Sequence, residues 1–207
     1  MSEKEKDIKV TESFNYCYED KFEMEDSEGR RLYINCIIDE SVVDTAVYNI
    51  LRYNRMDKGV PAEERKPIII YINSPGGSVI DGYSLIDAIT LSKTPVYTVN
   101  LGACFSMGLL IYMAGHKRFA FPRSEFLLHE GFISDGDSVS KVKDYLDFQS
   151  NQVEVMTKDY ILEHSKIGSD EYDRNMRKEW YFLPKEGKKI GIVDYILGED
   201  DELDTVI

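Results

Sequence analysis

Residues 96–114, VYTVNLGACFSMGLLIYMA, hold the strongest structural signal in the chain. Residues 96–101 are rich in β-formers, and residues 109–114 are apolar and able to continue as a helix. Ser106 therefore falls where a buried strand turns into a helix. Unpaired N–H groups at a helix start can stabilise negative charge on a substrate oxygen, so this position suits a nucleophilic serine, although serine is also a common helix N-cap.

Other parts of the chain repeat the alternation of strand and helix. Residues 67–73 form a continuous apolar run of the kind seen in a strand buried on both faces, and Ser74-Pro75-Gly76-Gly77-Ser78 follows directly. Such alternation predicts an α/β domain with a mostly parallel sheet and flanking helices. In these sheets ligands bind at the carboxyl ends of the strands, where Gly76, Ser106 and His129 are expected.

A serine nucleophile needs a base, and the chain offers three histidines. His116 lies in a polar turn and His164 ends a predicted helix, so both have simple structural explanations. His129 instead follows the apolar residues 126–128 at a predicted strand end. We therefore predict that His129 is the general base for Ser106.

The same strand ends supply candidate oxyanion donors. Gly76 and Gly77 carry no Cβ, so their backbone can approach a substrate closely. A plain Pro-Gly-Gly turn is the structural alternative. The Met107 N–H, directly after the serine, is the natural second donor beside that of Gly77.

Length, net charge and cysteine content limit the classes of protein to which the chain can belong. With 207 residues and a net charge of -13, nucleic acid and anionic membrane surfaces are poor partners. Three cysteines without CxxC spacing favour a reducing cytoplasm, and we expect a cytoplasmic location because no secretory signal or bilayer-length apolar run is evident. No metal-ligand spacing or other cofactor signature is found, so no cofactor is expected.

The domain organisation is predicted to be simple. Residues 1–28 are polar and acidic and are expected to form a flexible N-terminal arm, followed by one catalytic domain over residues 29–198. Residues 199–207 are an acidic C-terminal tail. A long helix is expected over about residues 138–165, with more apolar positions than one stripe, which fits either wrapping by its own domain or packing against another subunit.

Three motifs in this order resemble the Clp protease proteolytic subunit family: residues 71–77 (YINSPGG), residues 102–108 (GACFSMG) and residues 127–129 (LLH). The resemblance covers about residues 32–196. It implies a crotonase-like α/β fold and stacked heptameric rings, a tetradecamer, enclosing a proteolytic chamber. The long helix would be the projecting handle between rings. Ser106 and His129 would be the nucleophile and base, with the Gly77 and Met107 amides as oxyanion hole.

The third triad member and several flanking residues depart from the family pattern. Counting back from the Gly-x-x-Asp segment at residues 191–194 places Glu179 where the family has aspartate, and Asp173 is the alternative acid. Arg177 and Lys178 replace an aspartate–arginine pair linked to ring assembly. Phe105 replaces a small residue and is expected to narrow the substrate pocket. The N-terminal arm and residues 130–137 also differ from the family.

The leading hypothesis is a serine endopeptidase subunit of a self-compartmentalising Clp-like protease that acts on unfolded proteins through an acyl-enzyme. No Gly-x-x-x-x-Gly-Lys-Ser/Thr loop occurs, so ATP use would belong to a separate AAA+ ATPase. Two alternatives stay open. One is a phage-type capsid-maturation protease on the same fold; the other is a catalytically weak subunit that assembles with an active paralogue. Acyl-CoA chemistry on the crotonase scaffold ranks last, because a serine–histidine pair fits it poorly.

Overall fold

A computed structural model describes residues 26–131 and 138–207. Most of the predicted N-terminal arm, residues 1–25, and six of the residues after His129 lie outside the described ranges. The strands of the described part are β1 (Arg31–Ile34), β2 (Ile68–Ser74), β3 (Val96–Phe105), β4 (Lys117–Ala120), β5 (Glu125–Leu128), β6 (Trp180–Phe182) and β7 (Tyr195–Ile196).

Helices separate most of these strands, as the alternating pattern predicts. The α-helices are α3 (Tyr48–Met56), α4 (Val79–Thr90), α5 (Met107–Met113), α6 (Val139–Phe148), α7 (Glu154–Glu163), α8 (Ser169–Asn175) and α9 (Pro184–Lys189). The shorter π and 3-10 segments are η1 (Val43–Val47), η2 (Ala62–Glu64), η3 (Gln149–Val153) and η4 (Leu203–Val206).

The strands of the described residues form one sheet that divides along β3. The order β1-β2-β3-β4-β7 is parallel throughout, and the second half of β3 leaves β4 to pair in parallel with β5. Only β6 runs antiparallel, against β5. The prediction of a mostly parallel sheet with flanking helices is confirmed. The carboxyl ends of β2, β3 and β5 meet at one edge.

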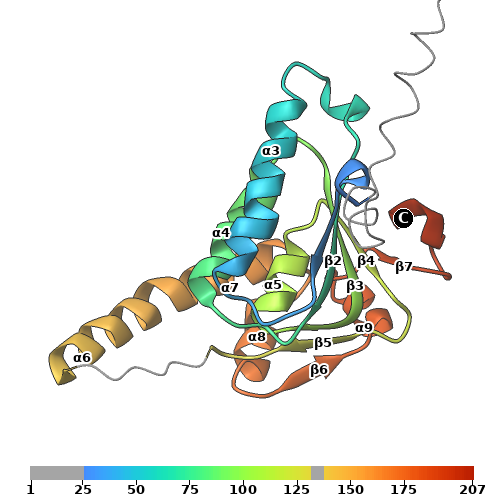
Figure 1. Cartoon of the computed structure of the whole chain (residues 1–207). Coiled ribbons are helices and arrows are strands. Elements are labelled where there is room, and N and C mark those ends of the chain that lie inside the picture. The colour runs from blue at the N-terminus through green and yellow to red at the C-terminus, as the bar shows by residue number, and fades with distance from the viewer. Residues whose placement is uncertain (1–25, 132–137) are drawn as a thin grey trace, which may run out of the picture.

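Two hydrophobic layers cover the faces of the sheet. The larger cluster joins the sheet to α4 and α5; every residue of α5 is buried. Figure 1 shows α3, α4 and α5 on one side of the sheet and the C-terminus on the other. On that second side Val206 of η4 is buried against a smaller cluster that includes Tyr71 and Phe119, and the Tyr71 hydroxyl donates to the Val206 carbonyl. Part of the acidic C-terminal segment is therefore packed on the sheet.

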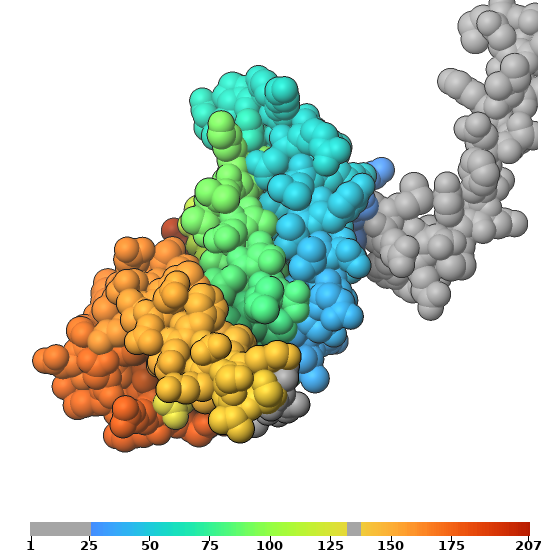
Figure 2. All heavy atoms as spheres, turned by 90° about the vertical axis from the view of Figure 1, so that its left-hand side faces the viewer, coloured from blue at the N-terminus to red at the C-terminus, as the bar shows by residue number. Residues whose placement is uncertain are grey.

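The predicted long helix is present as a nearly continuous run of α6, η3 and α7. Its first half projects away from the sheet (Figure 1), and none of the residues of α6 is buried. Figure 2 shows the face from which it projects, with the gold atoms of this helix beside the green atoms of α4. The π segment in the middle, residues 149–153, marks where the helix reaches the body of the domain.

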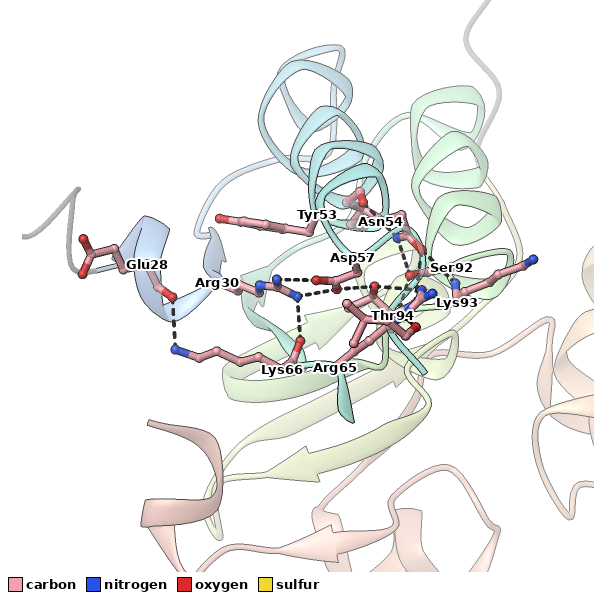
Figure 3. A network of polar contacts seen from close by, with 12 residues as sticks. Glu28, Arg30, Tyr53, Asn54, Asp57, Arg65, Lys66, Ser92, Lys93 and Thr94 are labelled. Carbon is pink, nitrogen blue, oxygen red and sulfur yellow. Dashed lines mark hydrogen bonds and ion pairs between the residues drawn. The ribbon is translucent and has the colours of Figure 1, made fainter. Parts of the chain in front are cut away.

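A polar network stabilises the end of the sheet where β1, β2 and β3 begin (Figure 3). Arg30 donates two hydrogen bonds to the Asp57 carboxylate, at 2.6 and 2.7 Å, and a third to the Lys66 carbonyl. The Thr94 hydroxyl donates to the same carboxylate at 2.7 Å. The Arg30 hydrogen bond holds the pKa of Asp57 below its ordinary value. This network ties β1 to the end of α3 and to the loop before β3.

Candidate active site

Ser106 sits on a sharp turn between β3 and α5. Its backbone has φ 52° and ψ -123°, a region that residues with a side chain rarely adopt. The turn is anchored on both sides: the Ser106 N–H donates to the Leu127 carbonyl at 2.9 Å, and the Ser106 carbonyl accepts from Leu109 at 3.0 Å. Such strain costs about 1–3 kcal/mol and persists where surrounding packing enforces it. A strained serine between strand and helix is a feature of nucleophile elbows.

Within residues 26–131 and 138–207 the Gly77 N–H has no acceptor, because Ile38 pairs with the residues on either side of Gly77. Ile38 donates to the Gly76 carbonyl at 2.9 Å and accepts from the Ser78 N–H at 2.7 Å. In a parallel bridge of this kind the N–H of the bracketed residue points to the other side. Any Cβ at Gly77 would overlap the Ile38 carbonyl oxygen, so this position requires glycine.

The second free amide belongs to Met107, the first residue of α5. Gly76 allows the two loops to approach, because a Cβ there would lie 2.8 Å from the Ser106 Cβ. Within the described ranges, neither the Gly77 nor the Met107 N–H donates to a protein acceptor. Both residues line the same cavity as Ser106.

Sequence reasoning gave Ser74 no role, yet its side chain holds the glycine loop. The buried Ser74 hydroxyl donates to the Cys36 carbonyl at 2.6 Å and accepts from the Gly76 N–H at 3.2 Å. A serine at the end of a buried strand, two residues before a glycine, is the local signal for such a turn.

His129 and Glu179 meet across the antiparallel pair of β5 and β6. Leu128 pairs with Trp180 at the end of this ladder, so the next residues, His129 and Glu179, face each other. His129 Nδ1 lies 3.0 Å from Glu179 Oε1. The side chains are 28% and 58% exposed, so solvent reaches the carboxylate more than the ring. His129 lines the cavity together with Ser106.

The other candidates are engaged elsewhere. Both carboxylate oxygens of Asp173 accept from Lys158 Nζ, at 2.7 and 2.9 Å, so Glu179 and not Asp173 is the acid bonded to His129. His116 Nδ1 accepts from the Val96 N–H, and burial lowers the pKa of His116. His164 packs on Tyr160, with ring centroids 4.2 Å apart.

The expectation that Phe105 narrows the pocket is wrong. Successive residues of a strand point to opposite faces, and Phe105 contacts Tyr181 edge-to-face, with ring centroids 5.8 Å apart. Phe105 is not among the residues that line the cavity beside Ser106. Phe105, where the family has a small residue, therefore adds an aromatic contact between β3 and β6. Other residues form the wall of the cavity.

The cavity beside Ser106 has a volume of about 740 Å³ and runs from the strand ends to α7 and α8. Among the described residues, no group of three or more His, Cys, Asp or Glu side chains could hold a metal ion. No helix within residues 26–131 and 138–207 is long and apolar enough to cross a membrane.

A serine on a strained turn, two backbone amides that line the same cavity, and a histidine of that cavity bonded to a carboxylate are the parts of a serine hydrolase. Comparison with known proteins specifies the family. The model of the Clp protease family matches residues 30–200. The chain belongs to the Clp protease family and is a serine endopeptidase of the proteolytic-subunit type.

Two curated relatives have the corresponding name. The ATP-dependent Clp protease proteolytic subunit of Deinococcus radiodurans is 27% identical over 181 residues, which cover 84% of this chain and 83% of the relative. The ATP-dependent Clp protease proteolytic subunit 1 of Frankia casuarinae is 26% identical over 174 residues, which cover 82% of this chain and 77% of the relative.

Proposed function

We propose that Ser106, His129 and Glu179 form the catalytic triad of a peptidase, with the Gly77 and Met107 amides as its oxyanion hole. The Ser106 hydroxyl makes no hydrogen bond within the described part of the chain, so it is free to engage His129 when substrate binds. The observation that carries the proposal is the 3.0 Å contact between Glu179 and His129, because His129 lines the cavity that Ser106, Gly77 and Met107 also line.

The chemistry follows from these positions. Ser106 Oγ attacks the peptide carbonyl while His129 takes the hydroxyl proton, and the carbonyl oxygen becomes an oxyanion held by the two amides. Collapse breaks the C–N bond, and His129 gives its proton to the leaving amine. Water, deprotonated by His129, then attacks the acyl-enzyme and releases the acid, which restores the Ser106 hydroxyl. Glu179 fixes the imidazole orientation and stabilises its cationic form.

The proposed assembly is a pair of stacked heptameric rings, a tetradecamer, with the active sites facing an enclosed chamber. The projecting helix supports this arrangement, because it leaves large apolar side chains exposed, among them Leu146 at 43% and Phe148 at 45%. Large apolar side chains left exposed by the described residues are typical of a surface that contacts another subunit. We further propose a cytoplasmic location, unfolded proteins as substrates, and a separate AAA+ ATPase that delivers them.

A fluorophosphonate probe tests the proposed nucleophile directly. Intact protein, shown to be assembled by light scattering, is labelled and digested, and the modified residue is read by mass spectrometry. We expect modification at Ser106 and none in the Ser106→Ala variant. Absence of labelling in the assembled parent would contradict the triad and favour the catalytically weak subunit that needs an active paralogue.

A further inference from the structure

The cavity beside Ser106 contains an ion pair that the triad does not use. Lys158 of α7 donates from Nζ to both oxygens of Asp173 of α8, at 2.7 and 2.9 Å. The Lys158 ammonium also lies 5.4 Å from the centre of the Tyr172 ring. Burial, reinforced by the charge of Asp173, raises the pKa of Tyr172 to about 12, so this ring stays neutral under working conditions. Both members of the pair line the cavity.

Tertiary contacts fix the ion pair relative to the nucleophile. The hydroxyls of Thr157 and Tyr83 are 2.6 Å apart, which ties α7 to α4. The Tyr160 hydroxyl donates to the Leu110 carbonyl at 2.9 Å, which ties α7 to α5, and α5 begins directly after Ser106. Ile161 is fully buried. Lys158 is thus presented from a helix turn that is packed against the elements carrying the site.

The other walls of the cavity are mixed, because polar side chains such as Gln149, Ser150 and Arg177 line it together with apolar ones. Val79, Met107, Leu110 and Val153 contribute aliphatic surface. A substrate side chain that enters the cavity can therefore meet aliphatic surface as well as the ion pair. An aliphatic side chain would remove water from the pair without replacing its hydrogen bonds, which is unfavourable.

Charged substrate side chains fit the pair less well than a neutral amide. A carboxylate would compete with Asp173 for Lys158, and in the same cavity it would face Glu130 and Glu154 as well as Arg177. An ammonium would compete with Lys158 for Asp173. In either case one member of the pair loses its partner. A carboxamide has both a carbonyl acceptor and N–H donors, so it can bridge Lys158 and Asp173 while the pair stays intact.

We propose that Lys158 and Asp173 form a polar specificity subsite that favours a glutamine side chain in the substrate residue occupying this cavity. Lys158 Nζ has a third N–H, and each Asp173 oxygen keeps a lone pair for the amide. The subsite rests on the proposed function, because it selects the peptide that Ser106 attacks.

The test uses the assembled full chain and fluorogenic peptides that differ at one residue, carrying glutamine, leucine, methionine, glutamate or lysine at successive positions before the cleaved bond. At one position we expect kcat/KM for glutamine to exceed that for leucine. In Lys158→Met and in Asp173→Leu the glutamine-to-leucine ratio should fall by about threefold to tenfold, the value of one or two hydrogen bonds. Ratios are compared within each variant, so a uniform loss from poorer folding cancels.

A matched control comes from a second ion pair outside the cavity. Lys185 and Glu199 are 3.1 Å apart on the surface, and Lys185→Met should leave the ratio unchanged. In Asp173→Leu, where Lys158 has lost its counter-ion, the ratio of glutamate to glutamine peptides should rise. An unchanged glutamine-to-leucine ratio in both cavity variants, with Ser106 still labelled by fluorophosphonate in the parent, would overturn the subsite alone. Failure of the parent to label would instead overturn the proposed triad.

Discussion

His129 and Glu179 occupy opposite positions in a continuation of the β5–β6 ladder. The observed pairs Phe126–Phe182, Leu127–Tyr181 and Leu128–Trp180 place them next in register, and their side chains meet at 3.0 Å. Residues directly opposite in an antiparallel pair have Cβ atoms about 4.5–5.5 Å apart. Two backbones paired in this way therefore bring a glutamate carboxylate to the imidazole without any further loop.

Glu179→Gln should lower kcat/KM on peptide substrates by about a hundredfold, because an amide cannot stabilise the imidazolium. In a triad whose acid is buried, the same kind of substitution lowers the rate further. Glu179 is 58% exposed, so water replaces part of its effect. Glu179→Asp keeps the charge on a shorter side chain and should retain much more activity. Steady-state hydrolysis of a fluorogenic peptide measures both. Equal activity of Glu179→Gln and the parent would remove Glu179 from the triad.

Ser106 should be a site where function opposes stability. Its φ of 52° is easily adopted by glycine and poorly by residues with a Cβ. We expect Ser106→Gly to have a free energy of unfolding about 1 kcal/mol higher than Ser106→Ala, while neither variant hydrolyses peptides. Denaturant titration of the two variants makes the comparison. If Ser106→Ala were the more stable, strain at the turn would not be released by removing the Cβ.

Gly77→Ala should disrupt the oxyanion loop, because the new methyl group would overlap the Ile38 carbonyl oxygen. The loop must move away from Ile38, so we expect at least a tenfold loss of kcat and a loss of about 2 kcal/mol in unfolding free energy. Gly168→Ala is the control, since a Cβ there meets no atom within 4 Å. Wild-type hydrolysis by Gly77→Ala would contradict the proposed role of this amide.

The Arg30–Asp57 pair should make stability pH-dependent on the acid side (Figure 3). Arg30 holds the pKa of Asp57 below its ordinary value of 3.8, so folding favours the ionised carboxylate. The ionised Asp57 carboxylate stabilises the fold fully at a pH above the pKa that Asp57 has in the unfolded chain. This stabilisation is lost as the pH falls through the lower pKa that Asp57 has in the folded protein. Asp57→Asn should cost about 3 kcal/mol near neutral pH.

The measurement for Asp57 is the unfolding free energy of parent and variant across pH. The difference between them should be constant near neutrality and shrink below about pH 4. Asp44→Asn, which changes an exposed acid in η1, serves as the control. If this difference in unfolding free energy did not change on acidification, the negative charge of Asp57 would contribute nothing to stability.

The projecting helix gives a prediction about assembly. Leu146→Glu combined with Phe148→Glu places two charges on its exposed apolar surface and should lower the particle mass measured by light scattering to that of a smaller species. Leu91→Glu, at an 80% exposed position after α4, is the matched control. An unchanged mass in the double variant would show that this surface does not hold subunits together.

Sequence alone predicted the parts of the site that depend on local pattern. A strand followed by a helix located Ser106, and an apolar run ending in a polar residue located His129. The carboxylate was harder, because β6 is only three residues long and pairs with β5 across about fifty residues of intervening chain. Its position came from family resemblance rather than from periodicity.

Two further features depend on contacts that sequence patterns do not encode. The apolar residues Ile192 and Val193 do not join strand β7 (Tyr195–Ile196), because their N–H groups donate to the Gly187 carbonyl in α9. The ion pair of Lys158 and Asp173 joins two helices through residues fifteen positions apart, and each side chain taken singly has the pattern of an ordinary surface charge.

Strand β6 is synthesised after β5, so the residues of the proposed site become available one after another. During synthesis Ser106 and His129 emerge from the ribosome well before Glu179, and β5 has no antiparallel partner until residues 180–182 follow. A nascent polypeptide on the proposed assignment thus carries a nucleophile and a base whose ring is not yet oriented. On this assignment, peptide hydrolysis requires that β6 has been synthesised and has paired with β5.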